Sequence, residues 1–274
     1  MGRIMRQLRG CGSIARRVAV CVALAELAAV SFLAPDRVLA AGCDETGTSP
    51  AEIAQAGEDL DIALKDDRSV RLAGVKSLSS GAASHLPDTP LTKWIADAAA
   101  GKTVTLRPLS PVGDRWGRIT ADMFVGGRNL QVLLAQAGLV VARPDDLRGP
   151  CWEAVKAAEA QARRANAGVW ALPQAILPAT DGAKLTERDG AFILASGQVR
   201  HVSRGKGRSY VDFGARGTNA LFLTIDTKAL TRMEKLGFKL EQLNERKILV
   251  RGVVSNGPSP HMVIDDVDAI EFWD

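Results

Sequence analysis

The sequence predicts a mainly β protein with helices, built from two small β-barrels, and three observations support this prediction. Short segments with alternating apolar residues recur along the chain, Gly and Pro separate them, and helical stripes lie between or after them. An aperiodic stretch at 172–189 divides these elements into two groups. We therefore expect domains at 58–171 and 190–274, joined by a linker at 172–189 and preceded by an N-terminal extension at 42–57.

Three strands of the first domain are predicted from alternation. They lie at Ser69–Val75, Lys102–Leu106 and Arg118–Val125. In the third strand the alternate apolar residues would share one face, and Gly126 and Gly127 supply the turn that follows. These strands form the half-buried part of a small barrel.

Three helices accompany these strands. The first begins after Thr89 and Pro90 and ends at Gly101, the second runs from Asn129 as N-cap to Gly138, and the third spans 152–167. Each has apolar residues at helical spacing on one side. Strands with helices inserted and appended indicate a barrel with packed helices.

The second domain has the element order of an OB-fold. Its predicted elements are strands near Phe192–His201, Ser209–Phe213 and Ala220–Ile225, a helix near Lys228–Leu236, and strands at Ile248–Val254 and Met262–Val267. Three strands, a helix and two strands define an OB-like β-barrel.

The segment 1–41 has the layout of a secretory signal peptide. Arginines precede an apolar run from Val18 to Ala34, and small residues follow around Ala40 and Ala41, where we expect cleavage. The run is about 17 residues, short of the roughly 20 that a span needs, so we expect no integral membrane span after cleavage. The mature protein would be periplasmic or secreted. A lipoprotein anchored at Cys43 is the alternative, although the preceding leucine lies one position too far upstream.

The positive charge of the chain belongs to this segment. The formal net charge is +4, and residues 1–41 contain six arginines and two acidic residues, so the rest of the chain is formally neutral. A neutral chain exerts no general attraction on polyanions. Any nucleic-acid binding therefore requires a local basic patch.

Two cysteines remain after the signal peptide. In an oxidising compartment, Cys43 and Cys151 are expected to form a disulfide, and two free thiols are the alternative. No histidine has the spacing from them that a zinc site requires.

Five short motifs follow one another along the first domain. They are Val70–Val75, Asp114–Arg118, Asn129–Leu139, Ala158–Arg163 and Gly168–Trp170. In order and spacing they resemble the thermonuclease (staphylococcal nuclease) family, which has an arginine-bearing strand, an aspartate followed by Tyr-Gly-Arg, a helix with a Gly-Leu-Ala end, and a helix closing on a tryptophan. The resemblance covers residues 58–171 and implies an OB-like five-stranded barrel with three helices.

The resemblance also implies a chemistry. The family hydrolyses phosphodiesters with a calcium ion held by aspartates, a glutamate that orients water, and two arginines that neutralise the phosphate. Arg71 and Arg118 match the two arginines. Lys76 and Ser79 stand where the family has a metal aspartate and the glutamate, and only Asp59 or Asp61 is placed to supply the other metal ligand.

Lysine at a metal-ligand position argues against hydrolysis. A like-charge contact at ~4 Å costs about 4 kcal/mol at an effective dielectric of 20, so such a site should repel calcium. We expect a metal-free anion pocket of Lys76, Arg71 and Arg118, with Trp116 available to stack a base. No cofactor is expected, and Ca²⁺ only if nuclease activity is retained. The alternative is structural: Arg71 pairs with a carboxylate such as Asp122, and Trp116 covers the barrel mouth.

A second candidate face lies in the C-terminal domain. Cations and aromatic rings alternate there, as single-strand binding requires, in the set Arg204, Lys206, Arg208, Tyr210 and Phe213. A solvated hairpin is the alternative.

These observations favour an exported, degenerate thermonuclease-like protein that binds single-stranded nucleic acid or another anionic polymer without efficient hydrolysis. One alternative is an active calcium-dependent phosphodiesterase whose rearranged metal site recruits Asp59, Asp61, Asp114 or Asp122. The other is an envelope interaction protein with no nucleic-acid ligand.

Overall fold

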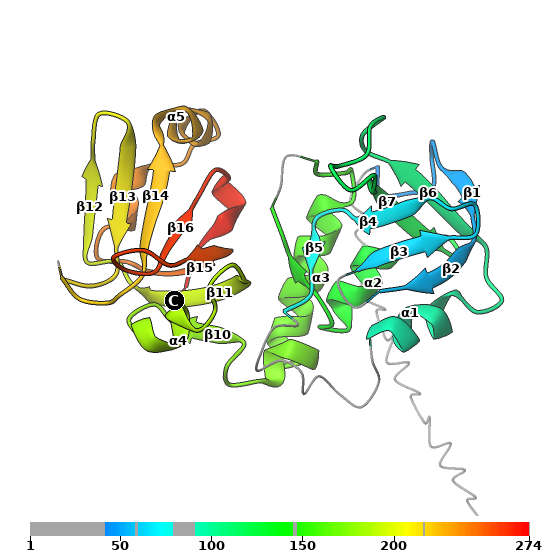
Figure 1. The fold of residues 1–274 in the computed structure, drawn as a ribbon, viewed down its shortest axis with the longest axis horizontal. Coiled ribbons are helices and arrows are strands. Elements are labelled where there is room, and N and C mark those ends of the chain that lie inside the picture. The colour runs from blue at the N-terminus through cyan, green and yellow to red at the C-terminus, as the bar shows by residue number, and fades with distance from the viewer. Residues whose placement is uncertain (1–41, 58–59, 79–90, 145–146, 216, 274) are drawn as a thin grey trace, which may run out of the picture. The chain divides into compact units, whose positions relative to one another are not determined.

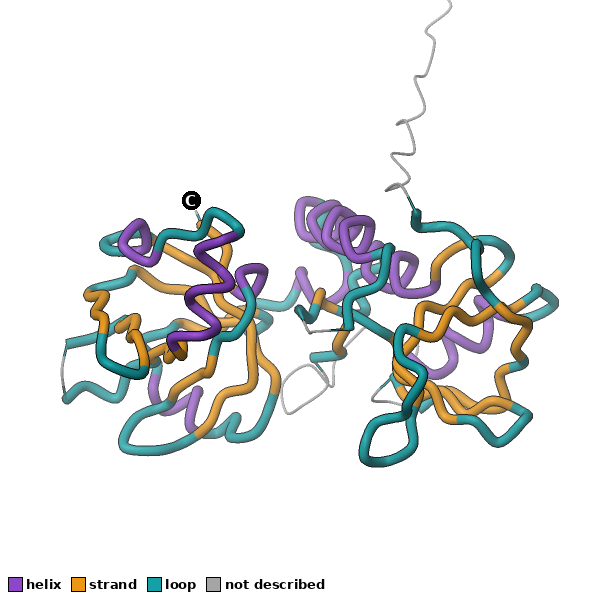
Figure 2. The backbone as a smooth tube through the Cα atoms, turned by 90° about the horizontal axis from the view of Figure 1, so that it is seen from above, coloured by secondary structure: helices purple, strands orange, loops and turns teal. Residues whose placement is uncertain are grey.

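The computed structural model describes residues 42–57, 60–78, 91–144, 147–215 and 217–273. Leu39–Asp274 forms one compact unit. The predicted signal peptide, Asp59 and Ser79 lie outside the described residues. Within the described ranges, none of the helices has the length and apolarity that crossing a membrane requires. The chain is a mixed, sheet-rich structure with a few helices (Figure 2).

The first sheet has seven strands and is curled (Figure 1). Its strands are β1 (Ser49–Ala51), β2 (Ile53–Ala56), β3 (Asp61–Leu64), β4 (Ser69–Leu72), β6 (Val104–Pro108), β7 (Ile119–Val125) and β8 (Arg128–Asn129). The order is β1-β6-β7-β4-β3-β2, with β8 paired to β7. Only Glu52 separates β1 from β2, so one continuous segment supplies both ends of the strand path.

The stretch 42–57, predicted as an N-terminal extension, contains β1 and β2 and so contributes two strands to the first sheet. Its two strands are only three and four residues long. Segments this short show too little alternation of apolar and polar residues for a strand to be predicted from the sequence. Pairing with β6 and β3 supplies the order that the local sequence does not.

Three helices accompany the first sheet, as predicted. They are α1 (Leu91–Ala99), α2 (Leu130–Gln136) and α3 (Trp152–Arg164). Asn129 caps α2, because its side chain accepts from the Val132 backbone N–H at 2.9 Å. After α2, Gly138 adopts φ +67° and approaches the backbone of Ala167 so closely that a Cβ would not fit. The short strands β5 (Val75–Lys76) and β9 (Val141–Ala142) form a separate two-stranded sheet.

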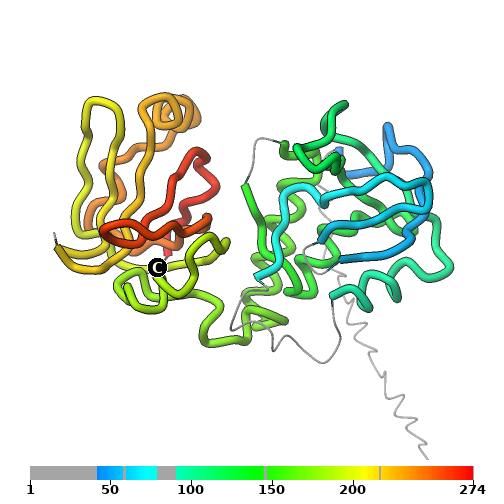
Figure 3. Tube along the Cα trace, viewed as in Figure 1, coloured from blue at the N-terminus to red at the C-terminus, as the bar shows by residue number. Residues whose placement is uncertain are grey.

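The second sheet has eight strands, in the order β10-β11-β15-β16-β14-β13-β12 with β17 paired to β15 (Figure 3). These are β10 (Ile176–Pro178), β11 (Phe192–Gln198), β12 (His201–Arg204), β13 (Arg208–Asp212), β14 (Phe222–Asp226), β15 (Lys247–Ser255), β16 (His261–Val263) and β17 (Ile270–Phe272). Helices α4 (Gly182–Thr186) and α5 (Thr227–Lys235) belong to the same region.

The predicted linker contains regular structure. Strand β10 and helix α4 both lie within 172–189, and their Leu177 and Leu185 are buried in the core of the second sheet. Nothing in the sequence indicated these elements, because they are only three and five residues long and two prolines and a glycine interrupt the segment.

Each sheet covers a hydrophobic core of its own. A third cluster joins Val141, Val169 and Trp170 to Leu194 and Leu249 of the second sheet. The two groups of strands are therefore packed into one unit by shared apolar burial.

Candidate anion-binding site

Arg71 on β4 lies between polar residues of the two neighbouring strands, β3 and β7. Arg71 lies opposite Asp61 of β3 on one side and opposite Thr120 of β7 on the other. Directly opposed residues on adjacent strands lie close enough for their side chains to interact. The register therefore puts an arginine, a carboxylate and a hydroxyl together on three strands.

The second predicted arginine reaches the same place from the turn before β7. Arg118 Nη1 donates to Asp61 Oδ2 at 2.7 Å, and its Nε donates to Asp114 Oδ2 at 2.9 Å. Asp61 is also the strand neighbour of Arg71. Asp61 is therefore the strand neighbour of Arg71 and an ion-pair partner of Arg118, and Asp114 is a further partner of Arg118.

A tight turn holds Asp114 in position. Its Oδ1 accepts the backbone N–H groups of Trp116 at 2.9 Å and Arg118 at 3.0 Å. Gly117 adopts φ +77°, and a Cβ on Gly113 would lie 2.9 Å from the Gly117 backbone. Both glycines are therefore needed for this turn to close.

The hydrogen bonds keep the pair charged. The Arg118 guanidinium, followed by the two backbone N–H groups, lowers the pKa of Asp114 from 3.8 to about 2. The hydrogen bond that Arg118 donates to Asp114 also raises the pKa of Arg118. Asp61 and Asp114 both bind this one guanidinium, which leaves less of its charge available to an outside anion. Asp61 Oδ1 is buried and has no hydrogen-bond partner among the described residues.

Trp116 is exposed beside these arginines. Its relative exposure is 61%, which excludes the alternative that it packs over a barrel mouth. The guanidinium carbons of Arg115 and Arg118 lie 3.8 and 4.6 Å from the centroid of its ring. Such distances are typical of cation–π contacts, and exposed Arg115 can move aside for another planar group.

Lys76 lies on β5, which pairs with β9 outside the seven-stranded sheet. Its side chain is partly buried. Lys76 therefore lies on a different strand from Arg71, and Arg118 directly precedes β7, although only three residues separate Lys76 from the end of β4.

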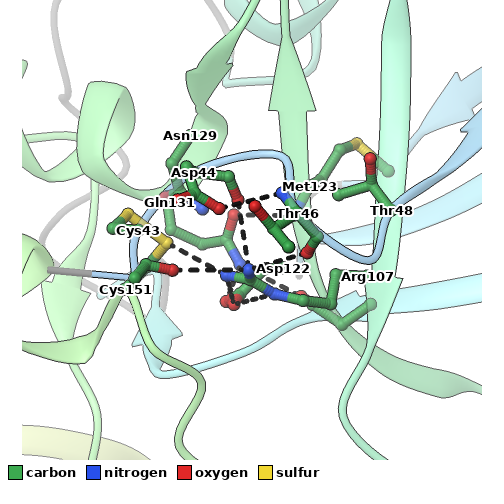
Figure 4. Close-up of polar contacts among 12 residues, drawn as sticks. Cys43, Asp44, Thr46, Thr48, Arg107, Asp122, Met123, Asn129, Gln131 and Cys151 are labelled. Carbon is green, nitrogen blue, oxygen red and sulfur yellow. Dashed lines mark hydrogen bonds and ion pairs between the residues drawn. A yellow bond between two sulfur atoms is a disulfide. The ribbon is translucent and has the colours of Figure 1, made fainter.

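The carboxylate considered as the partner of Arg71 binds another residue. Asp122 is buried, and Arg107 Nη2 donates to its Oδ2 at 2.8 Å (Figure 4). Burial raises the pKa of Asp122, and Arg107 opposes this shift. Asp122, the carboxylate given as an example of a partner for Arg71, therefore pairs with Arg107 instead. The register directly opposes Arg107 and Asp122 across β6 and β7. Arg107 directly follows the predicted strand Lys102–Leu106, so its charge opposite to that of Asp122 was a signal that could have suggested the pair.

Arg107 also holds the N-terminal segment. Its Nη1 donates to the carbonyl oxygens of Asp44 at 3.1 Å, Thr46 at 3.3 Å and Gly42 at 3.4 Å (Figure 4). Next to it, Cys43 and Cys151 form a disulfide across 108 residues, which confirms the predicted pair.

The candidate metal ligands that the structure describes pair with arginines and do not gather into a cation site. Asp61 and Asp114 bind Arg118, and Asp122 binds Arg107. In the described part of the chain, no three His, Cys, Asp or Glu side chains form a group able to hold a metal ion. Of the two predicted metal ligands, Asp59 lies outside the described residues.

The second predicted face is only partly exposed. Phe213 is 1% exposed and belongs to the core, so its assignment to the face was wrong: strand alternation turns Val211 and Phe213 inward and leaves Tyr210 outward, at 37% exposure. Lys206 and Arg208 are exposed at the hairpin. Arg204 binds Glu234 at 2.7 Å and Glu241 at 2.6 Å.

Comparison of the chain with models of known families gives no match, and comparison with curated proteins gives none either.

Proposed function

We propose that this chain is an exported, thermonuclease-like protein of two OB-like barrels. It binds single-stranded nucleic acid, or another anionic polymer, without efficient hydrolysis. The five motifs of the first domain and their spacing support the thermonuclease-like part. The curled first sheet and the helices beside it are compatible with the barrel that the resemblance implies.

One observation carries the proposal. The exposed ring of Trp116 lies beside two cations, Arg115 and Arg118. Such a ring offers a base a stacking surface, and the neighbouring cations offer its phosphate an electrostatic partner. An entering phosphate would compete with Asp61 and Asp114 for Arg118, which limits affinity but favours a polyanion that makes several contacts at once.

The same carboxylates argue against hydrolysis. Asp61 and Asp114 are already charge-paired with Arg118, and Lys76 stands where the resemblance implies a metal ligand. Calcium requires six to eight oxygen ligands, and its affinity falls as carboxylates are withdrawn. A rearranged calcium site would have to break two arginine pairs to form.

The test is retention of a fluorescent single-stranded DNA oligonucleotide by residues 39–274, with calcium or with a chelator. We expect binding that weakens with salt and is the same in both conditions. Trp116→Ala should weaken it roughly tenfold, because a stacked base contributes about 1–3 kcal/mol. Arg128→Ala is the control, since it removes an exposed cation at the opposite end of β7.

Two results would contradict the proposal. Calcium-dependent cleavage that Arg118→Ala abolishes would support the active phosphodiesterase instead. Neither retention nor cleavage would support the envelope interaction protein. Retention that Trp116→Ala leaves unchanged would place the binding surface elsewhere.

A further inference from the structure

Helix α5 presents three cations and a leucine along one exposed face. Lys228, Arg232 and Lys235 recur at intervals of four and three residues, and Leu236 follows at the C-cap. This spacing puts all four on one side of an α-helix. The other side carries the buried residues of α5, which packs against β13 and β14 (Figure 1). We call the three cations the basic stripe.

Among the described residues, no ion pair joins a cation of the stripe to a carboxylate. One acid lies near enough to act at longer range, since the Ala229 backbone N–H and then the charges of Arg232 and Lys228 lower the pKa of Asp226. The neighbouring Glu234 and Glu241 both bind Arg204 instead. Asp226 accepts from the Ala229 backbone N–H at 2.8 Å as the N-cap of α5. Glu234 and Glu241 are therefore paired with Arg204 and not with the stripe.

The arrangement has a cost for the helix itself. Like charges at i,i+3 and i,i+4 repel each other, and the stripe contains both spacings. The chain outside residues 1–41 is formally neutral, so the stripe is a local basic feature of a chain without excess positive charge. An anionic partner would relieve the repulsion.

Leu236 identifies the kind of anionic partner. Its side chain is 73% exposed, directly after Lys235. Phosphates of a nucleic acid would pair with the cations but would give this leucine no apolar surroundings. The stripe also contains no aromatic ring on which a base could stack. The boundary between headgroups and acyl chains of a bilayer accommodates both cations and a leucine.

We propose that this face of α5 docks on an anionic lipid surface, with the basic stripe at the headgroup phosphates and Leu236 inserted at the headgroup boundary. The proposal does not depend on the Trp116 site, which lies on another sheet.

The test is co-sedimentation of residues 39–274 with vesicles of equal parts phosphatidylglycerol and phosphatidylcholine. This segment omits the apolar N-terminal run, which would itself bind lipid, and it forms a compact unit. We expect binding that salt weakens, and none to pure phosphatidylcholine. Lys228→Gln with Arg232→Gln should weaken binding roughly thirtyfold, at about fivefold per cation. Leu236→Ser should weaken it roughly tenfold.

The control is Lys102→Gln with Arg128→Gln, which removes the same charge from exposed positions of the first sheet region and should leave vesicle binding unchanged. Thermal melting of each variant checks that it is folded. Equal loss in the control, or no loss in the stripe variant, would overturn the proposal. Absence of vesicle binding by the parent protein would also overturn the proposal. This includes the case in which the stripe variant loses DNA retention, which would indicate that the stripe binds nucleic acid instead of lipid. Trp116→Ala should leave vesicle binding intact, which separates this outcome from failure of the nucleic-acid proposal.

Discussion

A single guanidinium shows how neighbours decide the chemistry of a residue. Arg118 is the residue that the proposed function assigns to a phosphate, yet Asp61 and Asp114 bind it at 2.7 Å each. Under that proposal, both carboxylates occupy the guanidinium that a phosphate would bind. The ability of Arg118 to bind an outside ligand therefore depends on competition, not on exposure alone.

The Asp114–Arg118 pair predicts a pH dependence of stability. The pKa of Asp114 falls from 3.8 to about 2 in the folded protein, so its stabilising effect is complete above pH 3.8 and is lost as pH falls toward 2. Asp114→Asn removes this effect at every pH. We expect the difference in Tm between the parent and Asp114→Asn to narrow as pH falls through this window, as thermal melts at several pH values can measure.

Asp97→Asn is the control for that experiment. Asp97 pairs with Lys93 at an exposed i,i+4 position, where solvent screens the interaction. Its Tm should stay close to that of the parent throughout. A constant difference between the parent and Asp114→Asn would mean that the pair does not titrate as described.

Among the elements, the N-terminal segment depends most on tertiary contacts. Residues 42–48 have no strand of their own, and β1 is only three residues long. Arg107 holds the segment through backbone carbonyls, and Cys43–Cys151 links it to the start of α3. This segment therefore joins the sheet because it is tied down, not because its residues favour a strand.

Removal of the disulfide should lower stability substantially. The bond closes a separation of 108 residues, for which the chain-entropy estimate is about 4 to 5 kcal/mol. We expect Cys43→Ala with Cys151→Ala to lower the free energy of unfolding in urea by an amount of this order. Reductant should lower the stability of the parent and leave the double variant unchanged. Similar sensitivity of both proteins would show that the disulfide is not the group affected.

At the scale of the whole molecule, a buried ion pair joins the two groups of strands. Arg251 of β15 donates to Glu159 of α3 at 2.8 and 3.0 Å and to the carbonyl of Ala142 at 2.9 Å. Glu159 also accepts from the Ala142 N–H and from Arg163. Both Arg251 and Glu159 are buried, so neither can exchange its partner for water without a large cost.

Arg251→Met should therefore destabilise the protein. The substitution leaves Glu159 buried with one arginine fewer, and breaking a buried pair costs about 3 kcal/mol or more. Lys247→Met on the same strand is the control, because Lys247 is exposed. Adding Glu159→Gln to Arg251→Met should recover part of the loss in urea unfolding, since the amide still accepts from Ala142 without a buried charge. No recovery would indicate that lost packing dominates.

Long periodic segments were predictable from the sequence. Strand β7 and helices α2 and α3 lie close to their predicted bounds, because seven or more residues of alternation or helical spacing leave little ambiguity. Short elements such as β1, β10 and α4 were missed for the opposite reason. Motif spacing drew attention to Arg71 and Arg118 as candidates, whereas it gave no sign of the ion pairs Arg107–Asp122 and Arg204–Glu241.

The sequence by itself determined the sheet-rich class, the main helices and strands, and the cysteine pair. The class and the elements follow from local periodicity, and the cysteine pair follows because only two cysteines remain after residue 41. Only the tertiary structure decided which charges meet: Asp61 and Asp114 with Arg118, Glu159 with Arg251, and Glu234 with Arg204. The physical reason is that ion pairing depends on register and distance between segments far apart in the chain, whereas secondary structure depends mainly on neighbours.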